Sequence, residues 1–136
     1  MIKQVIVIRK ELKMRRGKEI SQGAHAAMCF MTRRMEDDFD PSLDSKGNRR
    51  YSMSLVVSEE EKEWITGSFT KIVCQVETLA EIEALHEAAL AAGLESNLMI
   101  DNGATEFSGQ KTVTALAIGP AEASKIDAIT GDLKLL

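Results

Sequence analysis

The sequence has few cysteines, which cross-link small secreted domains, and few aromatic residues, which stack on nucleic-acid bases. Among its 136 residues are 2 cysteines, 2 prolines and 4% aromatic residues. So few aromatic residues exclude a platform of interleaved aromatic side chains for stacking bases. Cys29 and Cys74 are far apart and form no Cys-x-x-Cys pair, so we interpret them as free, buried thiols in a reducing compartment.

Long hydrophobic runs are also missing. No apolar stretch approaches the roughly 20 residues that a membrane-spanning helix needs. Residues 1–9 contain a short apolar run without a small-residue cleavage site, which is typical of a strand rather than of a signal peptide. We therefore expect a cytoplasmic protein with no membrane partner. The composition that is present, 44% hydrophobic and 28% charged, is that of a globular domain.

Charge is unevenly distributed along a chain whose formal net charge is −4. Residues 1–34 hold nine basic and two acidic residues, whereas the rest of the chain is strongly acidic. A local positive patch on an acidic protein still attracts a polyanion, because binding depends on the local field. A solvated basic loop without a ligand is the alternative. The nine basic residues are Lys3, Arg9, Lys10, Lys13, Arg15, Arg16, Lys18, Arg33 and Arg34.

Hydrophobic periodicity predicts an alternation of strands and helices. Strands are predicted at 4–9, 71–76, 96–100 and 112–118, and helices at about 18–35, 79–92 and 122–130. Thr78 and Glu81 are typical of a helix start, Gly93 of a helix end, and Gly119-Pro120 of the end of the last strand. The order of elements predicts a single α/β domain, a three-layer α/β/α sandwich around a mixed four-stranded sheet. Strands 71–76 and 96–100 should be parallel.

Residues 36–63 fit this pattern least well. They are rich in acidic and polar residues, with Pro41 and Gly47 as breakers. We expect an acidic excursion from the core, with its mobility left open. The inner run 51–57 is either an additional edge strand or one arm of a hairpin.

The helix predicted at 18–35 has two distinct stripes. At about 100° per residue, Ile20, Ala24, Ala27 and Met31 share one stripe, and Lys18, Gln22, His25 and Cys29 lie nearly opposite. We predict that the first stripe packs on the sheet. The second is not a typical solvated face, so we predict that it lines a site.

Two loops are candidates for chemistry. Residues 10–18 place basic side chains at the start of a helix, where free N–H groups attract anions. Residues 101–106 follow a strand, and ligands of open α/β sheets bind beyond the carboxyl ends of strands. The Asp-Asn-Gly start of the second loop is also ordinary turn chemistry, so a simple turn remains an alternative.

Other chemistries have weaker support. His25 is a general base, a ligand or an ordinary helix histidine, and with Cys29 it has the spacing of two metal ligands. Zinc needs three or four ligands, so we expect no metal. Ser21 and Thr105 are nucleophiles in principle, but no neighbouring residue in the sequence marks either as activated.

Motifs in both halves of the chain resemble those of one family. The first half has Arg9, Glu11-Leu12, Lys13-Met14, the loop Arg15-Arg16-Gly17-Lys18, Gln22 and His25-Ala26. The second has Trp64 and Gly67, Ala-Ala-Gly-Leu at 91–94, Asp101, Gly103 and Thr105, then TVTALAIGP at 112–120 and ITGDLKLL at the end. In this order they resemble the archaeal and eukaryotic type (type 2) of peptidyl-tRNA hydrolase, over nearly the whole chain except about 36–63.

The resemblance implies hydrolysis of the ester between a peptide, or an N-acylated amino acid, and the 3′ ribose of tRNA, without metal or organic cofactor. It implies catalytic roles for Lys18, Gln22, Asp101 and Thr105. Lys18 would stabilise an oxyanion or hold a phosphate, and Asp101 would position or deprotonate water, or orient Lys18. The expected partner is peptidyl-tRNA, and a homodimer is expected from the resemblance alone. Substrate or tRNA contacts are expected from Arg9, Lys10, Lys13, Arg15, Arg16, His25, Arg33 and Arg34.

The sequence also departs from the family pattern. Where the family usually has Asp-Ala-Gly-Arg-Thr-Gln, this chain has a neutral Ala104 in place of the basic residue and an acidic Glu106 in place of the amide. Both changes weaken attraction to phosphate. They motivate two alternatives, a non-catalytic module that binds RNA or protein and a hydrolase of a smaller acyl ester.

Overall fold

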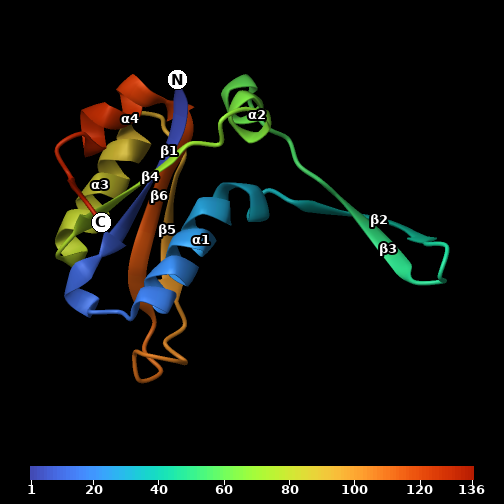
Figure 1. Cartoon of the computed structure of the whole chain (residues 1–136), viewed down its shortest axis with the longest axis horizontal. Coiled ribbons are helices and arrows are strands. Elements are labelled where there is room, and N and C mark those ends of the chain that lie inside the picture. Colours follow the sequence, from blue (N-terminus) through green and yellow to red (C-terminus); the bar gives the residue numbers. More distant parts are fainter.

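The computed structural model describes the backbone of all 136 residues, and the side chains of all but residues 37–41. Seven strands, four α-helices and one short 3-10 helix follow one another along the chain (Figure 1). They are β1 (Ile2–Arg9), the 3-10 helix (Lys10–Leu12), α1 (Arg16–Thr32), β2 (Glu36–Leu43), β3 (Arg49–Ser54), α2 (Glu59–Thr66), β4 (Lys71–Val76), α3 (Leu79–Ala91), β5 (Ser96–Asp101), β6 (Thr112–Glu122), α4 (Ala123–Thr130) and β7 (Lys134–Leu135).

Five strands form the main sheet, in the order β5-β6-β1-β4-β7. Strands β1 and β4 are parallel and all other neighbours are antiparallel, so the predicted mixed sheet is confirmed. The fifth strand was not predicted, because β7 consists only of Lys134 and Leu135, which pair with Gln75 and Cys74. Strands β4 and β5 run in the same direction, as predicted, although β1 and β6 lie between them.

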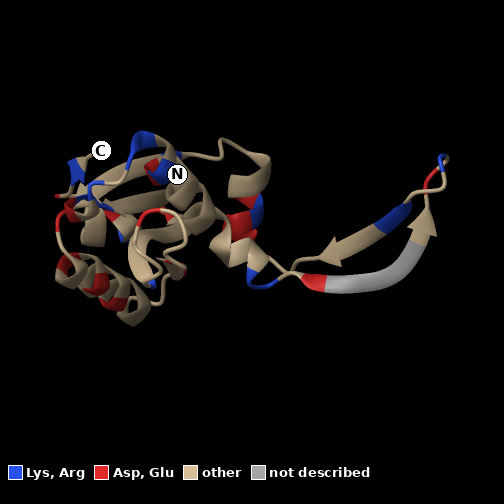
Figure 2. Cartoon of the chain, turned by 90° about the horizontal axis from the view of Figure 1, so that it is seen from below, with Lys and Arg blue, Asp and Glu red and all other residues tan. Residues whose placement is uncertain are grey.

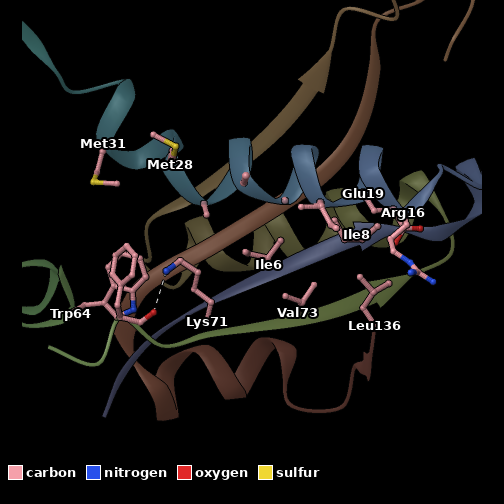
Figure 3. A pocket seen from close by; sticks show the side chains of 15 residues that line it. Ile6, Ile8, Arg16, Glu19, Met28, Met31, Trp64, Lys71, Val73 and Leu136 are labelled. Carbon is pink, nitrogen blue, oxygen red and sulfur yellow. Dashed lines mark hydrogen bonds between the residues drawn. The ribbon is translucent and has the colours of Figure 1, made fainter. Parts of the chain in front are cut away.

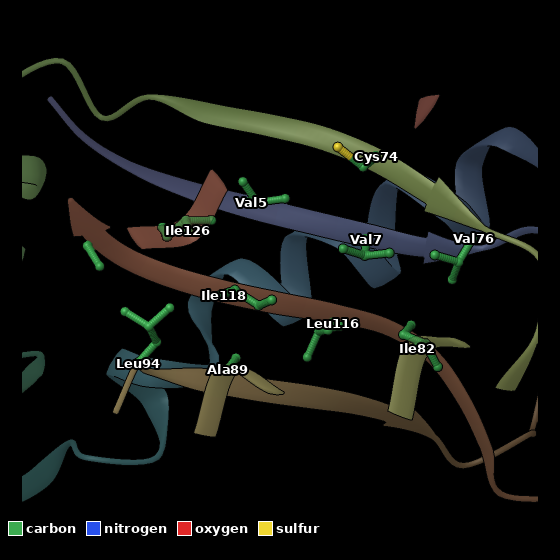
Figure 4. Close-up of a cluster of buried hydrophobic side chains, with 11 residues drawn as sticks. Val5, Val7, Cys74, Val76, Ile82, Ala89, Leu94, Leu116, Ile118 and Ile126 are labelled. Atoms are coloured by element: carbon green, nitrogen blue, oxygen red, sulfur yellow. The ribbon is translucent and has the colours of Figure 1, made fainter. Parts of the chain in front are cut away.

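The central strand β1 supplies side chains to two cores because successive residues point to opposite faces. Val5 and Val7 join the core that lies between the sheet and helices α3 and α4 (Figure 4). Ile6 and Ile8 join the core beneath α1. The domain therefore has the predicted three layers, with α1 and α3 on opposite faces of the sheet.

Helix α1 packs on the sheet through a different face from the one predicted. Its buried residues are Gln22, Gly23, Ala26, Ala27, Cys29 and Phe30, whereas Ile20 and Ala24 are exposed. This face lies between the two predicted stripes, about a quarter turn from each. Small residues line this face, and a Cβ on Gly23 would make ordinary van der Waals contact with Ile6, at 3.7 Å. One predicted stripe therefore lies along each flank of α1.

Residues 36–63 form a hairpin and most of a helix. Strands β2 and β3 pair antiparallel and extend away from the body of the protein (Figures 1 and 2). This agrees with the hairpin-arm interpretation of residues 51–57. Helix α2 was not predicted, although Ser58 and Glu61 form a complete capping box at its start. Trp64 of α2 is 1% exposed and packs edge-on against Phe30 of α1, with 5.9 Å between ring centroids.

Two predicted boundaries have different outcomes. Thr78 caps α3 by accepting a hydrogen bond from the backbone N–H of Glu81, and Gly93 follows the helix with a φ of +74°, so this helix is confirmed at both ends. Strand β6, in contrast, continues through Gly119 and Pro120 to Glu122, and its pairing with β1 shifts between Lys3 and Val5. The bulge lets the strand pass these residues without ending.

No helix in the part of the chain that the structure describes combines the length and apolar character needed to cross a lipid bilayer.

Candidate active site

The first turn of α1 and the end of β5 meet through Lys18 and Asp101. The Nζ of Lys18 donates hydrogen bonds to Oδ1 of Asp101 at 2.9 Å and to Oγ1 of Thr105 at 2.7 Å. The side chains of Lys18 and Asp101 are only 13% and 10% exposed. The structure thus brings together, in a partly desolvated position, three of the four predicted catalytic residues.

Gln22 joins the same cluster from the next turn of α1. Its Nε2 donates to Oδ1 of Asp101 at 3.1 Å, and its Oε1 accepts a hydrogen bond from Oγ1 of Thr114 at 2.5 Å. Gln22 is 2% exposed and Thr114, the third residue of β6, is fully buried. Both ends of the Gln22 amide are therefore fixed by hydrogen bonds, which holds the side chain in one orientation.

Thr114 is a member of the cluster that the sequence analysis missed. It lies in the apolar run 112–118 and was assigned to the strand without a separate role. A buried hydroxyl needs a hydrogen-bond partner, so a threonine inside an apolar strand was a signal that a polar group lies opposite it. Here that group is Gln22.

The backbone after β5 completes the surroundings of Asp101. Oδ2 of Asp101 accepts a hydrogen bond from the backbone N–H of Gly103 at 2.8 Å. Gly103 has a φ of +82°, and a Cβ there would lie 2.2 Å from the carbonyl oxygen of Gln110. Only glycine fits this position, so the predicted Asp-Asn-Gly turn is present and also orients the carboxylate.

Hydrogen bonds lower the pKa of Asp101. The main cause is the hydrogen bond from Lys18, which outweighs the opposing effect of burial, and the Gly103 N–H adds to it. Asp101 is thus a stable carboxylate at neutral pH. A carboxylate with a lowered pKa is a weak base, because general bases work best with a pKa near the working pH.

The predicted RNA-binding residues fall into two groups. Arg9, Lys10 and Arg33 are bound to other groups of the protein: Arg9 to Glu11 and the carbonyl of Val113, Lys10 to Glu19, and Arg33 to Asn97 and the carbonyl of Leu98. Arg34 likewise binds Glu61 and Glu95. Lys13, Arg15 and Arg16 are exposed around the start of α1.

The acidic substitution in the loop after β5 has a partner in the basic group. Nε of Arg15 lies 3.8 Å from Oε1 of Glu106, and the Arg15 side chain is 91% exposed. Phe107, the next residue, lies below Lys18, with 5.7 Å from Nζ to the ring centroid. The loop therefore contacts Lys18 through Thr105 and Phe107, and its acidic residue lies beside Arg15 at the start of α1.

His25 and Cys29 do not form a metal site with a third residue. Within the part of the chain whose side chains are described, no three His, Cys, Asp or Glu residues are grouped so as to hold a metal ion. Both cysteines are free and buried, and burial raises the pKa of the Cys29 thiol. Cys29 is therefore a poor nucleophile at neutral pH. His25 is exposed on the same flank of α1 as Gln22.

Each flank of α1 borders a hollow. The flank with Lys18, Gln22 and His25 faces β5, and Gln22 and His25 line a cavity there. The other flank, with Ile20, Ala24 and Met31, borders an apolar groove of about 660 Å³ over β1 and β4 (Figure 3). At one end of this groove Lys71 lies 3.1 Å from the centroid of the Phe69 ring, and burial lowers the pKa of this lysine.

Comparison with known proteins gives one family. The model of the family described as peptidyl-tRNA hydrolase PTH2 matches residues 2–136. Proteins named peptidyl-tRNA hydrolase are similar over the full length: 36% identity for Saccharolobus solfataricus, with 100% of both chains covered, and 37% for Methanopyrus kandleri, with 100% of this chain and 99% of the relative covered. The protein of Methanothermobacter thermautotrophicus is 33% identical over 99% of this chain and 100% of its own.

A solved structure shares the fold at much lower sequence similarity. It is a protein of unknown function from Agrobacterium tumefaciens, with a TM-score of 0.54 and 14% identity, covering 98% of this chain and 96% of its own. This likeness concerns the fold alone.

Proposed function

Because the chain belongs to the peptidyl-tRNA hydrolase PTH2 family, we propose that it hydrolyses the ester bond between a peptide, or an N-acylated amino acid, and the 3′ ribose of tRNA. Water adds its hydroxyl to the acyl carbon, the bond to the ribose oxygen breaks, and that oxygen takes the remaining proton. The observation that carries the proposal is the cluster in which Lys18 binds both Asp101 and Thr105 beside the exposed basic residues.

Lys18 is the electrophilic group in this proposal. An ammonium has three N–H donors, and Asp101 and Thr105 accept two of them. The third is free to bind the carbonyl oxygen as negative charge develops on it. A fixed donor in a partly desolvated site stabilises such an oxyanion by several kcal/mol, on the order of 10²- to 10³-fold in rate.

Asp101 orients Lys18 rather than taking a proton from water. Its oxygens already accept hydrogen bonds from Lys18, Gln22 and Gly103, and its lowered pKa makes it a weak base. Thr105 is exposed at the mouth of the cluster, where its hydroxyl is available to the water or to the ester. Gln22 holds the carboxylate from the buried side.

The tRNA backbone binds at the start of α1 through Lys13, Arg15 and Arg16. These side chains are exposed, and the N-cap residue Arg15 makes no side-chain capping bond, so the helix N-terminus is open to phosphate. Arg9 and Lys10, bound to protein groups, shape this surface rather than extend it, and Arg33 lies at the opposite end of α1. Acidic residues gather on α3, on the opposite face of the sheet (Figure 2), which favours one orientation of the RNA.

Two expectations about the protein in the cell belong to the same proposal. It works in the cytoplasm, where its substrate arises during translation. It forms a homodimer in which a second copy covers apolar surface beside α1, for which the exposed Ile20 and Phe69 of the groove in Figure 3 are the candidates. Light scattering at several protein concentrations, with Ile20→Glu as the variant, tests the dimer.

The test of the activity is release of N-acetyl-amino acid from N-acetyl-aminoacyl-tRNA by the purified protein. The same acyl group esterified to adenosine alone is the matched substrate without an RNA body. We expect efficient cleavage of the tRNA ester, weakened by salt, and poor cleavage of the adenosine ester. Equal cleavage of both would support the small-ester alternative, and cleavage of neither would support a binding module.

A further inference from the structure

The cluster opens into a second hollow that the catalytic roles above do not use. A cavity of about 440 Å³ lies between α1 and β5, within the size range of small-ligand sites. Gln22 and Asp101 of the cluster form part of its wall. Its other lining residues are His25, Met28, Cys29 and Thr32 of α1, and Met99, Ile100 and Asn102 of β5 and the loop after it.

The two elements run in opposite directions along this cavity. At one end Gln22 binds Asp101, and at the other Arg33 binds Asn97 and the carbonyl of Leu98. From Gln22 to Thr32 the helix rises by about 15 Å. An extended peptide covers about 3.4 Å per residue, so the hollow has the length of roughly four residues, starting at the reacting ester.

The side chains of the hollow favour an apolar and variable ligand. Met28 is 49% exposed, and it lines the cavity together with Met99, so two large apolar side chains lie on the same side of the sheet as the Asp101 carboxylate. Methionine is flexible and adapts to ligands of different shape. The charged residues Lys13, Arg15 and Arg16 lie at the opposite end of α1, so the hollow points away from the surface assigned to the RNA.

The sheet also offers backbone groups along this side. β5 is the outermost strand of the five-stranded sheet, and its edge away from β6 has no partner among the strands that the structure describes. Such an edge pairs readily with an extended peptide. The side chains that line the cavity and the unpaired backbone groups of β5 therefore both follow the length of this strand.

We infer that this hollow, named here the acyl groove, binds the C-terminal residues of the peptide that is esterified to tRNA. Met28 and Met99 contact the side chain of the residue next to the ester, and the chain continues toward Thr32. This inference rests on the proposed function, because it places the acyl half of the substrate opposite the RNA half.

The first experiment compares N-acetyl-Leu and N-acetyl-Gly esters on the same tRNA, so that the RNA contribution cancels. We expect wild-type kcat/KM to favour the leucyl ester by about tenfold, the effect of burying about half of the four-carbon leucine side chain. Met28→Ser should abolish most of this preference by lowering kcat/KM for the leucyl ester much more than for the glycyl ester. Leu90→Ser, a change at a side chain of α3 that is 53% exposed, should retain the preference.

The second experiment measures the length of the groove. Thr32→Trp, at an exposed position, should lower kcat/KM for a blocked tetrapeptidyl-tRNA about tenfold, a much larger loss than for the N-acetyl-Leu ester. A wild type that cleaves both acyl esters equally well, with neither variant changing the ratio, would overturn the acyl groove and leave the proposed function intact. A well-folded wild type that cleaves none of the esters would overturn both.

Discussion

The Nζ of Lys18 lies 2.9 Å from Oδ1 of Asp101, although 83 positions separate the two residues in the sequence. Lys18 lies in the first turn of α1, and Asp101 is the last residue of β5. The pair forms only when the helix packs on the sheet through Gly23 and Ala26. The Lys18–Asp101 pair therefore depends on the same packing of α1 on the sheet that forms the core beneath this helix.

Thr114 should affect turnover without touching substrate. Thr114→Val keeps the shape of the side chain but removes the hydroxyl that binds Gln22, so the amide can rotate away from Asp101. We expect kcat to fall roughly tenfold with little change in KM, because small misplacements of catalytic groups are costly. Thr112→Val, which removes a hydroxyl bonded to the carbonyl of Gln110, is the control and should stay near wild type. An equal effect of both changes would assign Thr114 a purely structural role.

The lowered pKa of Asp101 predicts the sign of a stability change with pH. The unfolded chain takes up a proton on this residue near pH 4, at about its ordinary pKa, and the folded chain only at lower pH. The stabilising contribution of the carboxylate is therefore complete above about pH 5 and is lost as the pH falls through the native pKa.

Urea unfolding between about pH 2.5 and 6 measures this effect. The free energy of unfolding of the wild type should fall relative to that of Asp101→Asn as the pH decreases below about 4. Above about pH 5 the difference between the two proteins should stay constant. A wild type that gains stability over the variant in acid would contradict the direction of the shift.

Charge reversal at the start of α1 should weaken RNA binding through the local field. Arg15→Glu/Arg16→Glu should lower the affinity for deacylated tRNA by at least tenfold at low salt and reduce the dependence of log K on log salt by about one to two. The control is Lys125→Glu/Lys134→Glu, which changes the net charge equally at two exposed positions near the C-terminus. Anisotropy titrations at several salt concentrations give both quantities. Equal losses in the two double variants would place the RNA elsewhere or show only an effect of net charge.

Glu106 should act against RNA binding. Its carboxylate lies 3.8 Å from Arg15 and repels phosphate, so Glu106→Gln should raise the affinity for tRNA about two- to fivefold at low salt, the small effect expected of an exposed pair. The gain should shrink in high salt. Glu87→Gln, at an exposed position of α3, is the matched control and should change the affinity little. An unchanged affinity in Glu106→Gln would show that this loop does not belong to the surface that binds RNA.

Local sequence patterns predicted most of the main sheet and the helices that cover it. Buried strands such as 71–76 were predictable because continuous β-branched runs differ clearly from helical patterns, and α3 because Thr78 and Gly93 have side chains suited to its two ends. The orientation of α1 was not predictable from hydrophobicity. Gly23 and Ala26 contribute little to a hydrophobic stripe, yet both are buried on the face of α1 that packs on the sheet.

The candidate site could be predicted only in part. Lys18, Gln22, Asp101 and Thr105 were predicted by resemblance, whereas the contacts among them depend on how α1 and β5 pack together. Thr114 was missed because the meaning of a buried hydroxyl depends on what lies opposite it. The sequence showed where the basic residues lie but not which of them bind other groups of the protein. That depends on partners far away in the sequence, such as Asn97 for Arg33.

The most direct test of the account is single-turnover hydrolysis of N-acetyl-aminoacyl-tRNA by the wild type, Lys18→Ala and Asp101→Ala. Circular dichroism and binding of deacylated tRNA serve as controls for fold and for the RNA surface. The account predicts cleavage by the wild type and a loss of about 100-fold or more in each variant, with fold and tRNA binding retained. Turnover near the wild-type rate in either variant would contradict the role assigned to that residue, and with it the Lys18–Asp101 pair as the catalytic centre.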